Sequence, residues 1–370
     1  MQGSADTRGS VPTDATRPFI YDAPSSRVVF GPGRLDTLGE ELDRLGVHRA
    51  LLVATGRDRS LVDRVAAALG ERYVATYDGV RPHVPVEVAA AARRLATDTQ
   101  ADGVVSIGGG STTGTAKAVA LTHAIPVVAV PTTYAGSEAT AVWGLTEEGV
   151  KSTGVDRNVL PRTVIYDPQL TLTLPVELSA VSGLNAMAHS VEAFWAPGRN
   201  PVSSALAERS IRALAAALPA VLVDPEDLDV RSGALLGAWL AGAAFAVAGS
   251  GLHHKVCHVL GGAYDLPHAQ THAIVLPHVL AANAPAAPQA AARIADALGV
   301  EDAADGLLAL NRRLGVPAGL RSIGLDEDQL ADATERVLAK VPADNPRPMG
   351  RDQVAALLHA AWRGEVEGDR

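Results

Sequence analysis

The strongest constraint on the fold is a change in sequence pattern near residue 165. Before this point, short apolar runs of the kind buried in sheets alternate with segments of helical periodicity. The expected strands are 27–30, 50–54, 73–77, 103–107, 126–130 and 163–166. From about residue 175 onward, alanine- and leucine-rich stretches with helical spacing are broken only by Pro and Gly. Because strands that alternate with helices form βαβ units, we predict an α/β nucleotide-binding domain with a parallel sheet over 17–165 and an all-α domain over 166–370.

The composition is that of a globular protein with a large core. Its 370 residues are 47% hydrophobic, which suits about two domains. Residues 1–16 are polar, so we interpret them as a disordered lead-in and not as a signal peptide. The apolar run at 234–249 is shorter than a membrane span and contains Gly, which favours a buried core helix. The single cysteine, Cys257, excludes an internal disulfide and is typical of the reducing cytoplasm.

The charge pattern excludes one class of partner. The formal net charge is -9, and Lys and Arg are spread along the chain without a basic stripe. Nucleic-acid-binding surfaces carry such a stripe, so we expect no nucleic acid partner. With no apolar run long enough to span a bilayer, we expect no membrane partner either. The expected partner is a small molecule.

A glycine-rich turn is the first candidate for cofactor binding. Gly108, Gly109 and Gly110 follow a predicted strand and open a predicted helix, with Ser111 and Thr112 next in the chain. Glycines let the backbone approach a pyrophosphate closely, and the N–H groups at a helix start attract an anion. The spacing matches neither GxGxxG nor a P-loop. A tight turn without a ligand is the alternative interpretation.

A second polar turn leaves the next strand in the same way. It contains Thr132, Thr133 and Ser137. In an open parallel sheet both turns lie at the carboxyl edge, where ligands bind. Thr55 follows an earlier strand, and no acid stands there to hold a ribose hydroxyl, while Arg57 would tolerate a 2′-phosphate. We therefore expect both NADH and NADPH to serve as cofactors.

Histidines are concentrated in one short region of the helical half. Six of the eleven lie between 252 and 280: His253, His254, His258, His268, His272 and His278. His254 and His258 are spaced i, i+4 and share a helix face, and Asn185 and His189 repeat that spacing on an earlier helix. Such a dense cluster indicates a functional site, although a histidine on an apolar face is often only a core residue.

Two chemistries fit this cluster. The spacing supports a metal site with His189, His254 and His268 as ligands. However, Asn185 offers only a neutral amide where a catalytic divalent metal often has a carboxylate, and neither Glu192 nor Asp265 has a matching spacing. Alternatively, the histidines supply proton donors and oxyanion stabilisers, with Lys255 adding positive charge.

Several stretches together carry a family resemblance. They are Gly108-Gly-Gly-Ser111 with Lys117, Pro131-Thr-Thr133, Ala135-Gly-Ser-Glu138, Asn185-Ala-Met-Ala-His189, His254-x-x-x-His258 and Pro267-His268. This set resembles the signatures of the iron-containing alcohol dehydrogenases, whose fold is dehydroquinate synthase-like. Within that family, 131–138, 160–168, Leu252-His-His-Lys255 and Leu260-Gly-Gly262 are similar to the maleylacetate reductases. The resemblance extends from Phe30 to Trp362.

Three departures from the family patterns bear on function. Asn185 stands where metal-dependent members have Asp, as in maleylacetate reductases, which implies that a metal is not required. Gly114 replaces the Asp of the family's GGGSxxDxAK pattern. Ala139, Val142 and Gln270 differ from the usual reductase pattern. If these three line the pocket, the substrate is a relative of maleylacetate.

The resemblance implies a specific reaction. A nicotinamide donates hydride to the conjugated C=C of maleylacetate or a close 4-oxo-2-enoate, and charge develops on the ketone oxygen as an enolate, giving 3-oxoadipate. We hypothesise that protonated His254, Lys255 and His258, with His189 and His268 nearby, stabilise that oxygen and deliver the proton. The same cations help to bind the dicarboxylate substrate. The resemblance also implies a cytoplasmic homodimer.

Three rival functions remain open at this point. The first is a metal-dependent alcohol dehydrogenase that acts on an aldehyde or ketone. The second is a lyase or cyclase that uses the nicotinamide only transiently. The third is a catalytically silent member of the family that serves in binding. The concentration of polar residues in otherwise apolar helices argues against this third function.

Overall fold

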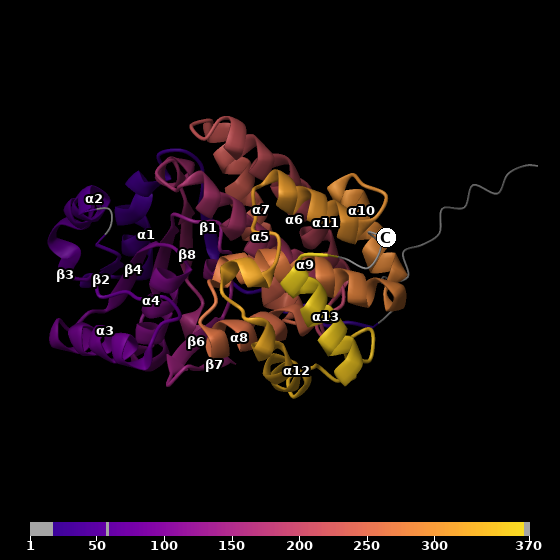
Figure 1. Ribbon diagram of the computed structural model, residues 1–370. Helices are drawn as coiled ribbons and strands as arrows, with labels where there is room; N and C mark the ends of the chain where they lie inside the picture. Colours follow the sequence, from indigo (N-terminus) through magenta and orange to yellow (C-terminus); the bar gives the residue numbers. More distant parts are fainter. Residues whose placement is uncertain (1–17, 57–58, 366–370) are drawn as a thin grey trace, which may run out of the picture.

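The chain folds into a sheet-containing half and a helical half that lie side by side (Figure 1). The computed structural model describes residues 18–56 and 59–365. The predicted lead-in at 1–16, and Arg57 of the cofactor argument, lie outside the described residues.

The first half contains a six-stranded sheet in which every pairing is parallel. Its strand order is β1-β8-β5-β4-β2-β3. The strands are β1 (Arg27–Phe30), β2 (Ala50–Ala54), β3 (Tyr73–Tyr77), β4 (Gly103–Gly108), β5 (Val127–Pro131) and β8 (Thr163–Tyr166). β2, β5 and β8 are buried along their whole length, as expected for strands covered on both faces. The predicted α/β class is confirmed.

Helices cover both faces of the sheet because side chains alternate along each strand. On one face, Leu52 and Val105 pack with α1 (Leu38–Leu45) and α2 (Arg59–Leu69). On the other face, Leu51 and Val104 pack with α3 (Val86–Asp98) and α4 (Gly110–His123). The strand order reverses between β2 and β4, so the turns after these two strands flank a switch point, where ligands bind in open α/β sheets.

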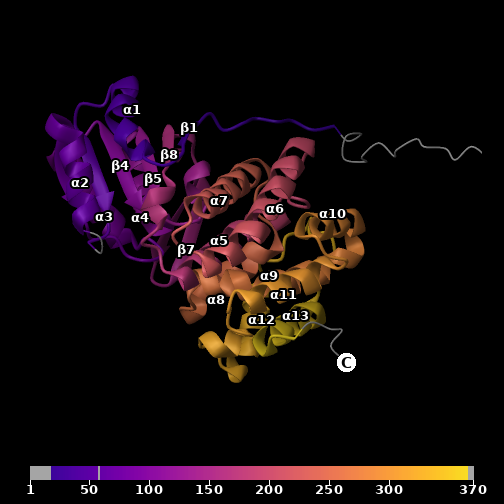
Figure 2. The same ribbon diagram turned by 90° about the horizontal axis from the view of Figure 1, so that it is seen from above.

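The second half is all-helical within the described residues, which confirms the predicted class. Its helices are α5 (Val176–Glu192), α6 (Pro201–Val223), α7 (Leu228–Ala248), α8 (Leu252–Tyr264), α9 (His268–Asn283), α10 (Pro288–Leu298), α11 (Ala303–Arg313), α12 (Leu330–Leu338) and α13 (Arg351–Arg363). One apolar cluster joins α5, α6, α7, α9, α10 and α11. A second cluster joins α8, α9, α12 and α13. Figure 2 shows α5 and α7 on the side nearest the sheet.

Helix α7 is long and apolar enough to span a membrane by length and composition alone. Half of the relevant window is buried inside the protein, and α7 packs against both α5 and α6. Gly237 lies against Leu214 of α6, where a Cβ atom would come within 2.6 Å of Leu214 Cγ. This packing agrees with the prediction of a core helix and with a soluble protein.

A two-stranded hairpin between the halves was not predicted. β6 (Val142–Glu147) pairs antiparallel with β7 (Val150–Val155). The hairpin lies between α4 and α8 in the ribbon (Figure 1) and contacts both helices. Neither strand has a continuous apolar run or a regular alternation of buried and exposed residues, which is why the apolar pattern of the sequence does not reveal them.

Candidate active site

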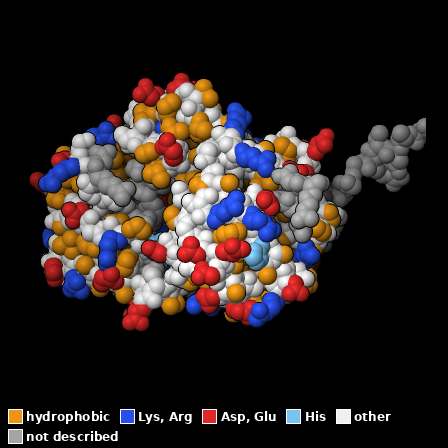
Figure 3. Space-filling model, viewed as in Figure 1, with side chains coloured by type: hydrophobic (Ala, Val, Ile, Leu, Met, Phe, Trp, Pro, Cys, Tyr) orange, Lys and Arg blue, Asp and Glu red, His pale blue; other side chains and the backbone are white. Residues whose placement is uncertain are grey.

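A cleft of about 800 Å³ lies between the two halves. The strand-end turns, the hairpin, α5, α7, α8 and the start of α9 all contribute to its walls. Its basic and imidazole residues are Lys117, Lys151, Lys255, His83, His189, His254, His258 and His268. No acidic residue lines the cleft in the part of the chain that is described. The outer face in Figure 3, by contrast, mixes acidic and basic side chains.

The turn after β4 has the shape that the glycines predict. Gly108 has φ +146°, and a Cβ on Gly109 would lie 3.0 Å from Thr133 Cγ2 of the second turn. The glycines thus let the two turns pack together. Gly110 begins α4, and Gly110 and Ser111 line the cleft. A helix N-terminus with free N–H groups suits a phosphate.

The second turn packs directly on the helical half. Gly136 has φ +77°, and a Cβ on Gly242 of α7 would lie 2.2 Å from the Gly136 carbonyl oxygen. Thr133 and Ser137 line the cleft, and the buried Ser137 hydroxyl has no partner within the described residues. An unpaired buried hydroxyl suits a polar ligand.

Lys117 has a different role from the one predicted. Its ammonium donates to the carbonyl oxygens of Ser137 (2.7 Å), Thr140 (2.8 Å) and Val142 (2.9 Å). Burial lowers the pKa of Lys117 to about 7, opposed by the nearby Glu138 carboxyl. Because its donors are used by backbone carbonyls, Lys117 holds the second turn to the hairpin, with no donor left for a phosphate.

The other three predicted cofactor residues, Thr55, Thr112 and Thr132, do not line the cleft. Thr55 lies at the end of β2 and forms an isolated bridge with Gly79. Thr112 is buried, and neither it nor Thr132 lines the cleft. Their part in cofactor binding stays a prediction.

The predicted histidines come together from three helices. His189 lies on α5, His254 and His258 on α8, and His268 at the start of α9. The rings of His189 and His254 stack, with centroids 5.0 Å apart. The His254 centroid lies 6.0 Å from that of His258, and all four rings line the cleft. Residues far apart in the sequence therefore form one polar wall.

The protonation state of this wall differs from the hypothesis. Burial lowers the pKa values of His189 and His254 to about 3. Burial, with the positive charge of Lys151 as the next cause, also sets the pKa values of His258 and His268 well below the usual value. These low pKa values favour neutral histidines near pH 7 in the free protein, so the positive charge of the cleft comes from its lysines.

Glu192 positions His254, a role that sequence spacing did not indicate. Its buried carboxyl group accepts hydrogen bonds from the backbone N–H groups of Gly251 (2.9 Å) and His253 (2.6 Å). It also pairs with Nδ1 of His254 at 2.5 Å. With the proton on Nδ1, His254 Nε2 carries the lone pair, and this atom has no partner in the described residues. The signal in the sequence is a glutamate three positions after His189, at the end of a helix whose last residues are all buried.

Asn185 and Phe245 complete the centre of the cleft. Asn185 donates weakly to the Ala135 carbonyl oxygen at 3.5 Å, while its own Oδ1 is buried without a partner among the described residues. The Phe245 ring contacts both histidines: its centroid lies 4.6 Å from the ring centroid of His189 and 4.9 Å from that of His254. Phe245 is a contact that the sequence reasoning missed, because it lies in the apolar stretch assigned to the core.

The donor atoms here fit a divalent metal poorly. The set Asn185, His189, His254 and His268 carries no negative ligand, although catalytic metals are usually held with some anionic charge. In the described chain, the only three His, Cys, Asp or Glu residues with ligand atoms all within 4.8 Å of one another are His253, Cys257 and His272. The predicted ligands His189, His254 and His268 do not converge to that extent.

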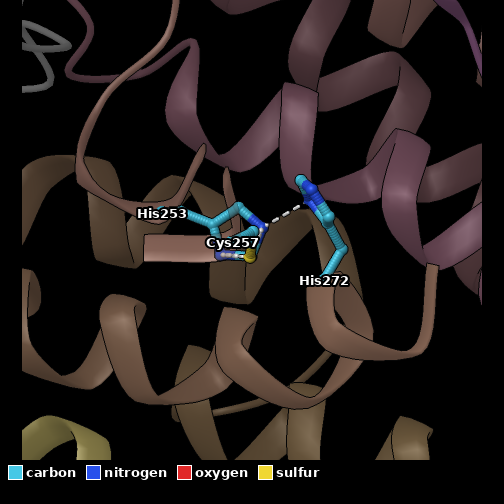
Figure 4. A group of neighbouring side chains, drawn as sticks. All are labelled: His253, Cys257 and His272. Carbon is cyan, nitrogen blue, oxygen red and sulfur yellow. Dashed lines mark hydrogen bonds between the residues drawn. The ribbon is translucent and has the colours of Figure 1, made fainter. Parts of the chain in front are cut away.

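The convergent trio is a hydrogen-bonded core cluster (Figure 4). His253 Nε2 and His272 Nδ1 are 2.9 Å apart and share a hydrogen bond. Burial raises the pKa of the Cys257 thiol well above its usual value, so the thiolate that binds metals is disfavoured. All three side chains are buried. The trio adjoins the site but does not line the cleft.

The departures from the family patterns have partial explanations. A Cβ on Gly114 would lie 2.8 Å from Val84 Cγ2, so Val84 takes the space of a larger residue there. Ala139 packs at Gly242, where a Cβ would lie 2.9 Å from Ala139 Cβ. Ala139 and Gln270 do not line the cleft, whereas Val142 does. Only Val142 can therefore contact a ligand in the cleft directly.

Comparison with known proteins agrees with this geometry. The profile described as "Iron-containing alcohol dehydrogenase" matches residues 24–168, and the C-terminal profile of the same family matches 179–362. The maleylacetate reductase of Burkholderia cepacia is 48% identical over 346 residues, which is 94% of this chain and 98% of that protein. A maleylacetate reductase structure from Rhizobium sp. strain MTP-10005 has a TM-score of 0.90 at 44% identity, covering 94% of this chain and 99% of that one. A putative alcohol dehydrogenase from Ralstonia eutropha JMP134 has a TM-score of 0.92 at 52% identity, with 94% and 99% covered.

Proposed function

We propose that this chain, which belongs to the iron-containing alcohol dehydrogenase family, is a nicotinamide-dependent oxidoreductase that reduces maleylacetate to 3-oxoadipate. The family is one of nicotinamide-dependent dehydrogenases. Several relatives of about 45–48% identity over most of the chain are maleylacetate reductases. The choice of maleylacetate as the substrate of this chain needs further support from the residues that line the cleft.

The observation that carries the proposal is the charge of the cleft. A protein with a formal net charge of -9 has, among its described residues, a cleft lined by lysine and histidine and by no acid. Clefts lined by one sign of charge concentrate ligands of the opposite sign. Maleylacetate is a dianion, whereas simple aldehydes and alcohols are uncharged. The cleft therefore favours a dicarboxylate substrate.

The strand-end turns on one side of the cleft can bind the cofactor, while the helical side contacts the substrate. The turn at Gly108–Ser111, with Thr133 and Ser137, offers N–H and hydroxyl groups to the phosphates of a nicotinamide cofactor. A nicotinamide held there would supply a hydride to the alkene carbon remote from the ketone. The alkene electrons then move to the ketone oxygen as an enolate, and the neighbouring carbon takes a proton to give 3-oxoadipate.

The opposite wall meets that enolate. Lys255 supplies positive charge, and neutral imidazoles can donate N–H bonds to an oxyanion. A bound dianion raises the pKa of nearby imidazoles, and the carboxyl group of Glu192 favours the protonated form of His254. His254 is therefore the preferred proton donor, and it regains its proton from solvent.

A metal is not required in this proposal. The neutral amide of Asn185 and the non-convergent histidines argue against tight binding of a divalent ion. The rival metal-dependent alcohol dehydrogenase would need that ion to polarise an aldehyde oxygen. We further propose that both NADH and NADPH are used and that the protein acts as a cytoplasmic homodimer.

The decisive experiment is an assay of NADH oxidation with maleylacetate beside a panel of enones and aldehydes, with and without a chelator. We expect turnover of maleylacetate that the chelator does not change. Turnover of aldehydes alone, abolished by the chelator and restored by zinc or iron, would establish the metal-dependent rival. Turnover without net change in nicotinamide absorbance would favour a lyase or cyclase.

A further inference from the structure

Lys151 is a cleft lysine that the reaction scheme above does not use. It lies on β7 opposite Thr146 of β6. Its side chain crosses the hairpin beside Gly144, where a Cβ atom would lie 3.1 Å from Lys151 Cε. Lys151 lines the main cleft and also a small adjoining cavity of about 80 Å³. Lys151 is thus part of the wall of the ligand-binding space.

The hairpin holds Lys151 in place from both halves of the protein. On the sheet side, Thr146 donates from its N–H to the Val84 carbonyl oxygen (3.1 Å) and from its hydroxyl to the His83 carbonyl oxygen (2.8 Å). On the helical side, a Cβ on Gly262 of α8 would lie 3.1 Å from the Gly149 carbonyl oxygen in the hairpin turn. The hairpin that carries Lys151 is therefore held by contacts with both halves of the protein.

Lys151 differs from Lys117, the fully buried lysine of the cleft. Lys117 donates to three carbonyl oxygens and lies near Glu138. Within the described residues Lys151 forms no ion pair or side-chain hydrogen bond, and Asp265, which lines the same small cavity, does not pair with it. Burial lowers the pKa of Lys151, and no carboxyl group counteracts that effect. A half-buried cation without a counter-ion is costly, so the site is suited to an anion that arrives from outside.

Lys151 lies close to histidines from both halves of the protein. Its charge acts on His254, His258 and His268 on the helical side and on His83 on the sheet side. Lys255 lies on the same wall as the histidines. Lys151 and Lys255 thus approach the cleft from different elements, so Lys151 can meet a substrate carboxylate while Lys255 faces the developing enolate.

We propose that Lys151 binds a carboxylate of the substrate and that the β6–β7 hairpin selects dicarboxylates over uncharged carbonyl compounds. This inference rests on the proposed function, because it names the group that recognises the dianion. It also gives the hairpin, and the Gly262 that lets it approach α8, a purpose beyond packing.

The test compares Lys151→Met with a charge-matched control, Lys340→Met, which removes an exposed lysine after α12. We expect Lys151→Met to lower kcat/KM for maleylacetate by about 10- to 100-fold, mainly through KM, because a charge-assisted hydrogen bond is lost. NADH affinity and the melting temperature should stay unchanged, as should all parameters of Lys340→Met. Lys151→Arg should restore part of the loss.

The dimethyl ester of maleylacetate separates charge recognition from a structural effect. Lys151→Met should change turnover of this uncharged ester by less than about threefold, because no charge-assisted hydrogen bond is lost. Equal losses on the ester and the dianion, or an unchanged KM for the dianion, would overturn the proposal.

Calorimetry distinguishes failure of this inference from failure of the proposed function. Adipate, an unreactive six-carbon dicarboxylate, is titrated into the NADH-loaded protein and the Lys151→Met variant. If wild-type protein does not reduce maleylacetate yet binds adipate more tightly than the variant does, the proposed reaction is wrong and the anion site stands. If both bind adipate equally, the anion site is wrong whatever the reaction.

Discussion

The two walls of the cleft are built in different ways. The sheet wall consists of backbone: Gly109 and Gly136 let two strand-end turns approach each other and the helical half. The helical wall consists of side chains from α5, α8 and α9, in which burial favours neutral histidines beside Lys255. A backbone wall suits the constant phosphates of a cofactor, whereas a side-chain wall can be adapted to one substrate. Variants in each wall should therefore alter different kinetic constants.

The largest effect is expected from His254→Ala in the helical wall. Loss of the proposed proton donor should lower kcat by about 10²- to 10⁴-fold, the usual range for a general acid. NADH affinity should be unchanged, since the other wall is intact. Steady-state kinetics and fluorescence titration measure both quantities, with the exposed His48→Ala as control. A normal kcat in His254→Ala would remove this residue from the mechanism.

Glu192→Gln should have a smaller effect, because it acts only through His254. We expect kcat to fall by about 10- to 100-fold, as is typical when the partner that orients a functional histidine is altered. Without the negative carboxylate, the pKa of protonated His254 in the complex falls. The loss of kcat with rising pH should therefore begin at a lower pH in the variant than in the wild type. A lower kcat with an unshifted pH profile would indicate a merely structural role.

Gly109→Ala addresses the sheet wall. The added Cβ would lie 3.0 Å from Thr133 Cγ2, so the two turns must move apart. We expect the Kd for NADH to rise by about tenfold, on the order of 1.4 kcal/mol, with kcat at saturating cofactor nearly unchanged. Gly39→Ala is the matched control, because its Cβ would meet nothing within 4 Å. A loss of kcat without a change in Kd would contradict the division between the walls.

The last prediction concerns stability at acid pH. Burial holds the pKa values of His189, His253 and His254 at about 3 in the folded state. Below the unfolded value of 6.5, the unfolded chain takes up protons that the folded chain refuses, so stability falls as the pH falls. Each such histidine contributes about 1.4 kcal/mol per pH unit in this window.

Two carboxyl groups act in the opposite direction. Burial raises the pKa values of Glu138 and Glu192, so the folded state retains protons on them that the unfolded state releases. Urea unfolding between pH 7.5 and 5 measures the sum. A free energy of unfolding that does not decrease toward pH 5 would show that the contribution of the three histidines does not exceed that of the two carboxyl groups.

The sequence alone determined the α/β and all-helical halves, the glycine turn and the histidine cluster, because each is a local pattern. Period-two and period-3.6 hydrophobicity reflects burial of neighbouring residues. The φ of Gly108 favours glycine through the local backbone alone, whereas Gly109 is needed because Thr133 of the second turn comes close. The β6–β7 hairpin mixes apolar and polar residues without either period and was missed.

Only the tertiary structure decided which groups meet and in which charge state. Glu192 reaches His254 across 62 residues, and Lys117 is used by the carbonyls of a loop. Lys151 enters the cleft from an unpredicted strand. Burial makes the predicted imidazolium groups neutral. Desolvation and long-range contacts depend on the whole fold, so no local pattern encodes them.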